Sequence, residues 1–255
     1  MAFIDSYLDR LGLQPPIGAD LDHLRRLHVA HLERVPFENL SIALDDPLSL
    51  EHEALARKIL DRGRGGFCYE LNGLFAELLS AVGFEVTLLA ARVWTGDCYG
   101  PPLDHLALLV GCSDGSEWLA DVGFGAHSRY PLGLNFGVEQ PDPDGTFLVD
   151  DAQGDVTVAM NGVLQYRLER HPRELPDFRA MCWYQQHSPA SHFTANAICS
   201  RSTPDGRISL REDTLVLTTG GEKHETKLID DPAILVAYRE HFGIELDRVP
   251  RIAKA

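Results

Sequence analysis

Three side chains in this sequence are of the types, and in the order, that thiol-based catalysis requires: Cys68, His105 and Asp121. A nucleophilic thiol needs a base that accepts its proton, and the base needs an acceptor that fixes its tautomer. Cys68 follows a pair of glycines and opens an apolar run at helical spacing, so the dipole of the expected helix favours the thiolate. Taken alone, Cys68 could equally be a small buried apolar residue, as free cysteines usually are.

Of the eleven histidines, His105 is the best placed to act as the base, because it stands at the start of the apolar run 106–110, after a Pro-Pro turn. Asp121 ends the next expected strand, and the turn 113–115 would make the two strands antiparallel neighbours. We therefore expect His105 and Asp121 to meet across the strands. Separately they could be an edge histidine and a turn cap; together with Cys68 they favour a catalytic triad.

The elements that must position these residues follow from hydrophobic periodicity. The first third is expected to be helical, with Asp20 and Ser49 as N-caps of two helices. From Phe84 onward, short β-like runs alternate with Gly, Pro and Asp turns. The predicted helices are 20–36, 49–63 and 68–83, with a closing helix from Asp231; the predicted strands are 86–93, 106–110, 118–122, 146–149, 156–160, 164–168, 193–198, 207–210, 215–218 and 225–228, and 131–145 is predicted to be a long loop.

This order of elements predicts an α+β fold. An N-terminal helical bundle (1–83) would carry the thiol, a central β-barrel or sheet (84–190) would carry the histidine and aspartate, and a C-terminal α/β lid (191–255) would follow. A chain of 255 residues is long enough to bury a core and to build such units around one cleft.

Composition narrows the classes of function. The hydrophobic fraction of 44% and the charged fraction of 24% are typical of a globular protein, and no apolar run approaches the ~20 residues of a membrane span. The first residues do not have the pattern of a signal peptide, and the five scattered cysteines suggest neither a disulfide framework nor a zinc site. We therefore expect a cytoplasmic protein without metal or membrane partner.

The net charge of −15 argues against nucleic acid as a partner, because phosphate binding needs a basic face. An anionic cofactor would require a local pocket of backbone NH groups and a few basic side chains. Such a pocket is feasible, because salt screens distant charges beyond about 8–10 Å.

Three segments together resemble the arylamine N-acetyltransferase family. They are Val-Pro-Phe-Glu-Asn-Leu at 35–40, Arg-Gly-Gly-Phe-Cys-Tyr-Glu-Leu-Asn at 64–72 and Asp-Val-Gly-Phe-Gly at 121–125, and the resemblance extends from about Phe3 to beyond Phe193. It implies a helical bundle, a β-barrel and an α/β lid around a papain-like Cys-His-Asp cleft. It also implies that Cys68 is the nucleophile, His105 the base and Asp121 the orienting carboxylate.

The resemblance further implies a ping-pong reaction in which acetyl-CoA acetylates Cys68, and an arylamine, arylhydrazine or arylhydroxylamine then accepts the acetyl group. The glycines of the segment 123–127 would let backbone NH groups approach a pyrophosphate. In the family, Gly125 and Phe193 correspond to positions that contact CoA, and Phe37, Val93 and Phe124 to positions that line the acceptor pocket. Oxyanion stabilisation could come from the NH of Cys68 or, as a weaker candidate, from Asn72.

Three further residues near the expected site have other interpretations. Arg64 and Glu38 are predicted to form a structural ion pair beneath the site. Asp104 stands before His105 where family members often carry Thr or Ser, and a carboxylate there could change cofactor contacts or the titration of His105.

Other functions use the same three residues. One alternative is an amide synthase of related fold that takes an acyl chain from a carrier. Another is a papain-like or transglutaminase-like thiol hydrolase, and a third is a binding module with a relict site. The physiological amine, the preferred acyl chain and the oligomeric state stay open.

Overall fold

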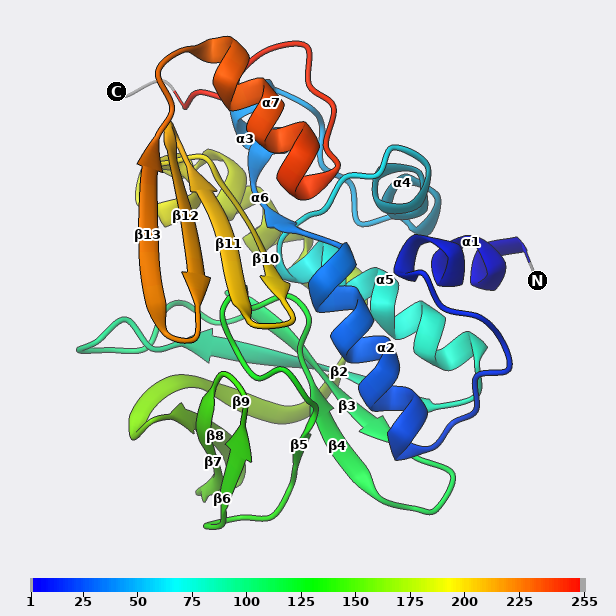
Figure 1. Cartoon of the computed structure of the whole chain (residues 1–255). Helices are drawn as coiled ribbons and strands as arrows, with labels where there is room; N and C mark the ends of the chain where they lie inside the picture. Colours follow the sequence, from blue (N-terminus) through cyan, green and yellow to red (C-terminus); the bar gives the residue numbers. More distant parts are fainter. Residues whose placement is uncertain (1, 253–255) are drawn as a thin grey trace.

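The computed structural model describes residues 2–252 and contains two β-sheets with helices packed against both. Figure 1 shows the eight-stranded sheet in the lower half, the five-stranded sheet with α7 (Asp231–Phe242) above it, and α2 (Leu21–Arg34) and α5 (Cys68–Ala81) beside the two sheets. The predicted α+β class is confirmed, and it is shared with solved structures.

The N-terminal third is helical, as predicted. Helix α2 begins where the sequence indicates, because Asp20 accepts a hydrogen bond from the His23 backbone NH at 3.0 Å. Ser49 is not the cap of the next helix: its hydroxyl accepts the NH of Glu51, and the helix begins at His52. The elements of this third are α1 (Ala2–Leu11), α2, β1 (Phe37–Glu38), α3 (Leu40–Leu44), α4 (His52–Ala56), the π-helical η1 (Arg57–Asp61) and α5.

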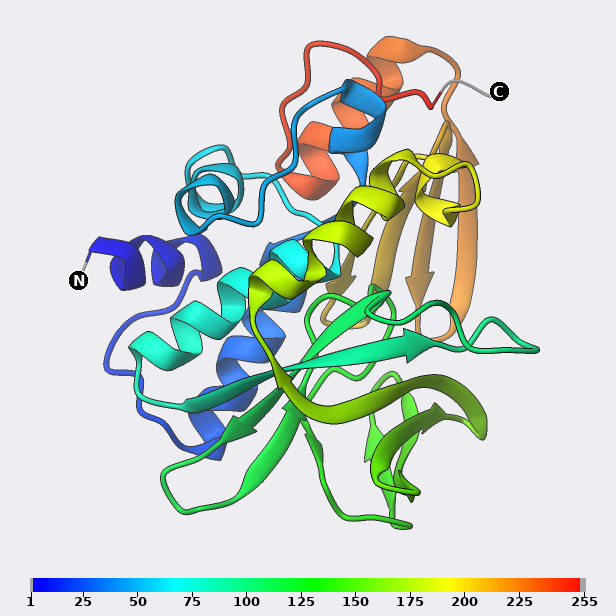
Figure 2. The same ribbon diagram turned by 180° about the vertical axis from the view of Figure 1, so that it is seen from behind.

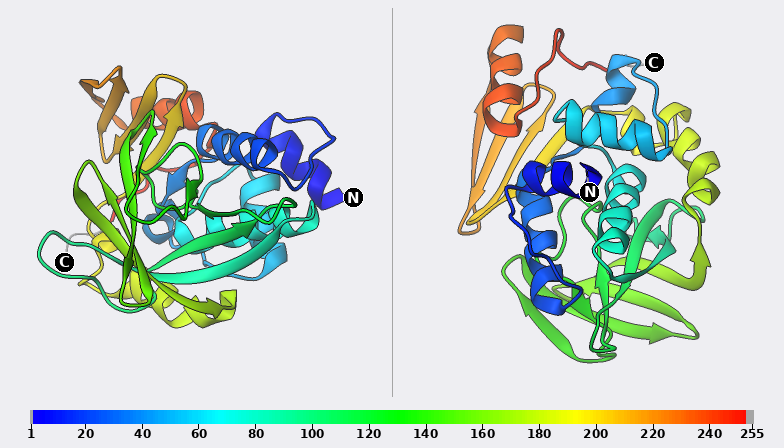
Figure 3. Two further views of the ribbon diagram at one scale, coloured as in Figure 1. Left: turned by 90° about the horizontal axis from the view of Figure 1, so that it is seen from below. Right: turned by 90° about the vertical axis from the view of Figure 1, so that its right-hand side faces the viewer.

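The eight-stranded sheet curls so far that it resembles an open barrel, as the view from below in Figure 3 shows. The strand prediction for 118–122 is two residues too long, since β4 ends at Ala120. The loop prediction for 131–145 is wrong, because this segment contains two short strands. The Gln140 side chain links them: its Oε1 accepts the NH of Gly133 and its Nε2 donates to the carbonyl oxygen of Gly133. In order of pairing the strands are β5 (Leu132–Gly133), β4 (Glu117–Ala120), β3 (His105–Gly111), β2 (Glu85–Val93), β9 (Val163–Arg173), β8 (Asp155–Met160), β7 (Gly145–Ala152) and β6 (Glu139–Asp142).

The five-stranded sheet joins segments that are far apart in the chain, because β1 pairs with β10. The strand predicted at 193–198 is wrong: Ser191 caps a short helix, and β10 begins only at Ile198. The predicted division into 1–83, 84–190 and 191–255 stays a prediction. The order in this sheet is β1, β10 (Ile198–Thr203), β11 (Gly206–Arg211), β12 (Thr214–Thr219) and β13 (Glu222–Lys227).

The sequence did not indicate one helical segment, which consists of η2 (Leu175–Phe178) and α6 (Arg179–His187). Figure 2 shows this segment rising from the eight-stranded sheet toward the five-stranded sheet, on the side of the molecule opposite α2. Among residues 2–252, no helix combines the length and the hydropathy that a membrane crossing requires.

Candidate active site

The thiol of Cys68 lies in the first turn of α5, where the sequence places it. Glu70 holds the start of this helix, because its Oε2 accepts the backbone NH of Phe67 at 3.2 Å. Cys68 is buried, with 3% of its surface exposed. Burial raises the pKa of the Cys68 thiol and so opposes the effect of the helix dipole; a thiolate here would need a nearby base.

The glycine pair before Cys68 is required by close packing. A Cβ at Gly65 would lie 1.8 Å from the carbonyl oxygen of Pro36, and one at Gly66 would lie 2.6 Å from Oε2 of Glu70. Both distances are shorter than the 3.0 Å below which Cβ atoms in proteins essentially never approach another heavy atom. Only glycines therefore let the chain reach Cys68 along this path.

His105 begins β3, Asp121 directly follows the end of β4, and their side chains meet, which confirms the predicted contact. Nε2 of His105 lies 2.7 Å from Oδ2 of Asp121, and both side chains are buried. Burial opposes ionisation of Asp121, but attraction to His105 and hydrogen bonds from His105 and Asn72 outweigh it, and the pKa of Asp121 falls to about 2. A carboxylate at Nε2 leaves Nδ1 as the ring nitrogen that can accept a proton.

The segment after Asp121 packs directly on the start of α5. A Cβ at Gly123 would lie 2.7 Å from Cα of Cys68 and 2.8 Å from Nδ2 of Asn72, so this position must be glycine. Two residues later, Gly125 has φ +95°, a backbone conformation that glycine adopts most readily. It faces the ring of Phe37.

One cavity of about 600 Å³ brings most of the predicted site residues together. Cys68 and His105 both line it, and other parts of its wall come from the segment after β4, from β2 and the loop after it, from α6 and the region that follows it, and from β10 and β11. Asp121 and Asn72 do not line it and lie behind His105. The predicted residues in its wall are Phe37, Cys68, Val93, His105, Phe124, Gly125 and Phe193.

Asn72 is not available as an oxyanion donor. Its Nδ2 donates to the carbonyl oxygen of Leu106 at 2.6 Å and to Oδ1 of Asp121 at 2.9 Å, and its Oδ1 accepts the NH of Val122. An amide nitrogen has only two hydrogens, so both are occupied inside the protein. Asn72 therefore supports Asp121, and the NH of Cys68 stays the predicted oxyanion donor.

The cavity wall also contains basic residues that sequence reasoning did not select: Arg207 and Arg211. They alternate on β11 with Ile208 and Leu210, which are buried in the core under α7. Since a strand turns successive side chains to opposite faces, this alternation is the signal that could have placed the two arginines on the cavity side. Burial lowers the pKa of Arg207 to about 10, so it is still a cation at neutral pH.

Asp104 lies in the cavity wall beside His105. Its Oδ1 accepts the backbone NH of Val93 at 2.9 Å. Burial raises the pKa of Asp104 to about 6 in spite of that hydrogen bond and the nearby His105 and Arg92. The cavity therefore gains a negative charge as the pH rises through about 6.

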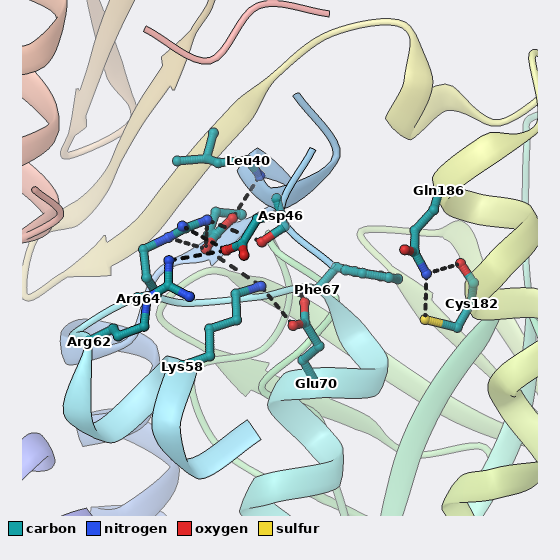
Figure 4. A network of polar contacts seen from close by, with 11 residues as sticks. Leu40, Asp46, Lys58, Arg62, Arg64, Phe67, Glu70, Cys182 and Gln186 are labelled. Atoms are coloured by element: carbon teal, nitrogen blue, oxygen red, sulfur yellow. Dashed lines mark hydrogen bonds and ion pairs between the residues drawn. The ribbon is translucent and has the colours of Figure 1, made fainter. Parts of the chain in front are cut away.

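The predicted ion pair between Arg64 and Glu38 is confirmed, with 2.8 Å between Nη2 and Oε1. Lys58 and Glu70 form a second buried pair at 2.7 Å, and Figure 4 shows Arg64, Lys58 and Glu70 beside the loop that leads into α5. Neither pair lines the cavity that contains Cys68, so the network supports the loop that leads to the thiol.

No side chains in the described range 2–252 form a group of three or more His, Cys, Asp or Glu that could hold a metal ion. All five cysteines are free thiols.

Comparison with known proteins gives consistent matches over nearly the whole chain. A family model described as "N-acetyltransferase" matches residues 20–251. An arylamine N-acetyltransferase / N-hydroxyarylamine O-acetyltransferase of Salmonella typhimurium is 31% identical over 97% of this chain and 91% of its own length. An arylamine N-acetyltransferase of Mycolicibacterium smegmatis is 34% identical over 95% of this chain and 92% of its own length.

Solved structures agree with these matches. The arylamine N-acetyltransferase of Salmonella typhimurium superposes with a TM-score of 0.90 at 30% identity, covering 100% of this chain and 95% of that chain. The Mycobacterium marinum arylamine N-acetyltransferase in complex with CoA superposes with a TM-score of 0.85 at 32% identity, covering 94% and 92% of the two chains.

Proposed function

This chain belongs to the arylamine N-acetyltransferase family, and on that premise we propose that it transfers an acetyl group from acetyl-CoA to aromatic amines, hydrazines and hydroxylamines through an acetyl-cysteine at Cys68. One observation carries the proposal: Cys68 and His105 line the same cavity, while Asp121 occupies Nε2 of His105. This arrangement has the parts of a thiol–imidazole–carboxylate triad.

In the first half-reaction, Nδ1 of His105 accepts the proton of the Cys68 thiol. The Cys68 sulfur then forms a bond to the thioester carbonyl carbon, and the bond between that carbon and the sulfur of the donor breaks. The imidazolium of His105 returns its proton to the departing thiolate. Asp121 stabilises the imidazolium in this step, which offsets the effect of burial on the thiol.

In the second half-reaction, the amine nitrogen attacks the acetyl carbon on Cys68. The carbon–sulfur bond breaks, and the proton that the nitrogen loses passes to His105. The NH of Cys68 at the start of α5 is the proposed donor to the oxyanion formed in both half-reactions.

The acceptor pocket is proposed to lie against Phe37, Val93 and Phe124, three apolar side chains in the wall beside the thiol. An aromatic ring would bury its apolar faces there, while its amino group stays near Cys68 and His105. This shape supports aromatic acceptors rather than highly polar ones.

The phosphate groups of the acyl donor are proposed to lie against Arg207 and Arg211. These two residues, with Ala126 and Ser209, also form the wall of an adjoining cavity of about 780 Å³ between the segment after β4 and the face of β11–β13. Hydroxyl groups of Ser200 and Ser202 accept hydrogen bonds from Arg207, which fixes its guanidinium. Lys223 is a third cation of the adjoining cavity, and the carboxylates of Asp144, Glu212 and Glu225 line it as well. Arg207 and Arg211 are the two cations that line both cavities, and for that reason they are the proposed phosphate contacts.

The test is the intact mass of the protein after incubation with acetyl-CoA alone. The expected result is one acetyl group, absent in Cys68→Ser and present in Cys182→Ser, a matched change of another buried cysteine. Aniline or an arylhydrazine should then remove the acetyl group and appear as the acetylated product. No adduct, with activity only on a carrier-bound acyl chain, would favour an amide synthase; steady release of CoA without an amine would favour a hydrolase.

A further inference from the structure

The segment that joins β4 to β5 carries Asp121, Phe124 and Gly125, and one buried side chain from another element holds it at two points. That side chain is His28, in the middle of α2, with none of its surface exposed. Its Nε2 accepts the backbone NH of Asp121 at 3.2 Å, and its Nδ1 lies 2.9 Å from the carbonyl oxygen of Arg129. A single imidazole thus fixes the first and the ninth residue of the segment.

The chemistry of these two partners determines the tautomer of His28. A backbone NH can only donate and a carbonyl oxygen can only accept, so Nε2 must be unprotonated and Nδ1 must carry the hydrogen. Burial lowers the pKa of His28, against the attraction of Asp121 and Asp142. The ring is therefore neutral, as both hydrogen bonds require.

We propose that His28 is a positioning residue for acetyl transfer, which fixes Asp121 and the segment 121–129 relative to Cys68 through its two backbone hydrogen bonds. The proposal rests on the proposed function. The NH of Asp121 comes directly after the last residue of β4, where strand pairing ends. Its hydrogen bond to His28 sets the direction in which the Asp121 carboxylate leaves the strand to meet His105.

A second buried histidine on the same helix shows what packing alone would look like. His31 is also fully buried, but neither ring nitrogen has a hydrogen-bond partner in the described part of the chain. Both histidine rings contact Phe75, at centroid distances of 6.3 Å for His28 and 5.2 Å for His31. The two residues therefore share packing and differ in hydrogen bonding, which makes His31 a matched control.

The experiment measures alkylation of Cys68 by iodoacetamide at pH 6.5, followed by peptide mass spectrometry, with the melting temperature of each variant. This rate needs no acyl donor and reports the fraction of thiolate, which the His105–Asp121 pair maintains. A thiol with the ordinary pKa of about 8.5 is only about 1% thiolate at this pH, and burial raises the pKa of Cys68 further. Complete loss of the pair would therefore slow alkylation of a fully formed thiolate by at least about 100-fold.

His28→Leu removes both hydrogen bonds and should slow alkylation by at least ~10-fold, whereas His31→Leu should change it by less than ~3-fold. His28→Gln supplies one acceptor and a donor, as the neutral imidazole does, and should restore the rate to within ~3-fold of the parent. His28→Asn covers the case in which His28→Leu does not fold: its shorter side chain can reach Arg129 but leaves the NH of Asp121 unpaired, so it should resemble His28→Leu in rate.

Equal rates in His28→Leu, His28→Asn and His31→Leu, or failure of His28→Gln to restore the rate, would overturn the proposal. Acetylation of Cys68 by acetyl-CoA, measured in parallel, separates this result from the proposed function. A parent protein that is alkylated rapidly but never acetylated would refute the acetyl transfer and leave the effect of His28 on the triad measurable.

Discussion

Asn72 donates a hydrogen bond to Oδ1 of Asp121 at 2.9 Å, so the helix that carries Cys68 also holds the carboxylate that orients His105. The same amide nitrogen donates to the carbonyl oxygen of Leu106, and the amide oxygen accepts the NH of Val122. One buried side chain thus ties α5 to β3 and to the end of β4. The relative positions of the thiol, the imidazole and the carboxylate depend on this bridge.

The first prediction concerns Asp121→Asn. An amide NH2 group facing Nε2 of His105 would place the ring hydrogen on Nδ1, the atom that accepts the thiol proton in the proposed reaction. The rate of Cys68 acetylation should therefore fall by about 10³–10⁴-fold, measured by rapid quench and intact mass. Asp114→Asn, the same change in the exposed turn between β3 and β4, is the control. Near-parent acetylation in Asp121→Asn would remove this residue from the triad.

The second prediction concerns the pH dependence of stability at Asp104. Its pKa of about 6 in the folded chain lies above the ordinary value of 3.8, so the folded state binds the proton more tightly than the unfolded state. Stability from this group is present below about pH 4 and is lost as the pH rises through about 6. Asp104→Asn should therefore raise the melting temperature relative to the parent more at pH 7.5 than at pH 4.5. An equal difference at both values would contradict the shift.

Asp104→Asn should also change the binding of the acyl donor. Removal of a negative charge from the cavity wall should lower the KM for acetyl-CoA by ~2–5-fold at pH 7.5, and less at high salt. The effect should disappear near pH 5, where the carboxyl group is already neutral. Steady-state kinetics at the two pH values measure it.

A third prediction tests the proposed phosphate contacts. Arg211→Gln should raise the KM for acetyl-CoA by about 5–10-fold, because it removes a charged hydrogen-bond donor. The KM for S-acetyl-pantetheine, which has no phosphate, should not change. Arg26→Gln makes the same change on the exposed side of α2 and is the control. Equal effects on both thioesters would place the phosphates elsewhere.

The fourth prediction concerns the buried ion pairs under α5. Lys58→Met leaves the carboxylate of Glu70 without its 2.7 Å partner, and the free energy of unfolding should fall by about 3–5 kcal/mol. Adding Glu70→Gln should recover much of this loss, since it removes the uncompensated charge. Arg170→Met breaks an ion pair with Asp151 that is about half exposed and should cost less than about 1 kcal/mol. Urea unfolding measures all three; a double variant no more stable than Lys58→Met would contradict the explanation.

Local sequence was enough to predict several parts of the site. The glycine pair and the apolar run placed Cys68 at a helix start, and the turn between two apolar strands brought His105 to Asp121. These predictions succeed because they depend on residues close in the chain, where periodicity and turn chemistry determine the outcome. Two local predictions were wrong: the helix cap at Ser49 and the strand at 193–198. The hydroxyl of Ser49 accepts a hydrogen bond in the turn before α4, and the hydroxyl of Ser191 caps a short helix where the strand was expected.

The tertiary structure decided what surrounds the proposed triad. His28 meets Asp121 across 93 residues of chain, and Asn72 meets it across 49. Neither contact has a periodic signal, because it depends on how α2 and α5 pack against the end of β4. The same packing buried the thiol and raised its pKa, so that a base is needed where the helix start alone had favoured a thiolate. The chain by itself determined the order of the thiol, the imidazole and the carboxylate that we propose to react. Packing decided which side chains hold them, because hydrogen bonds between distant residues form only when the elements that carry them meet.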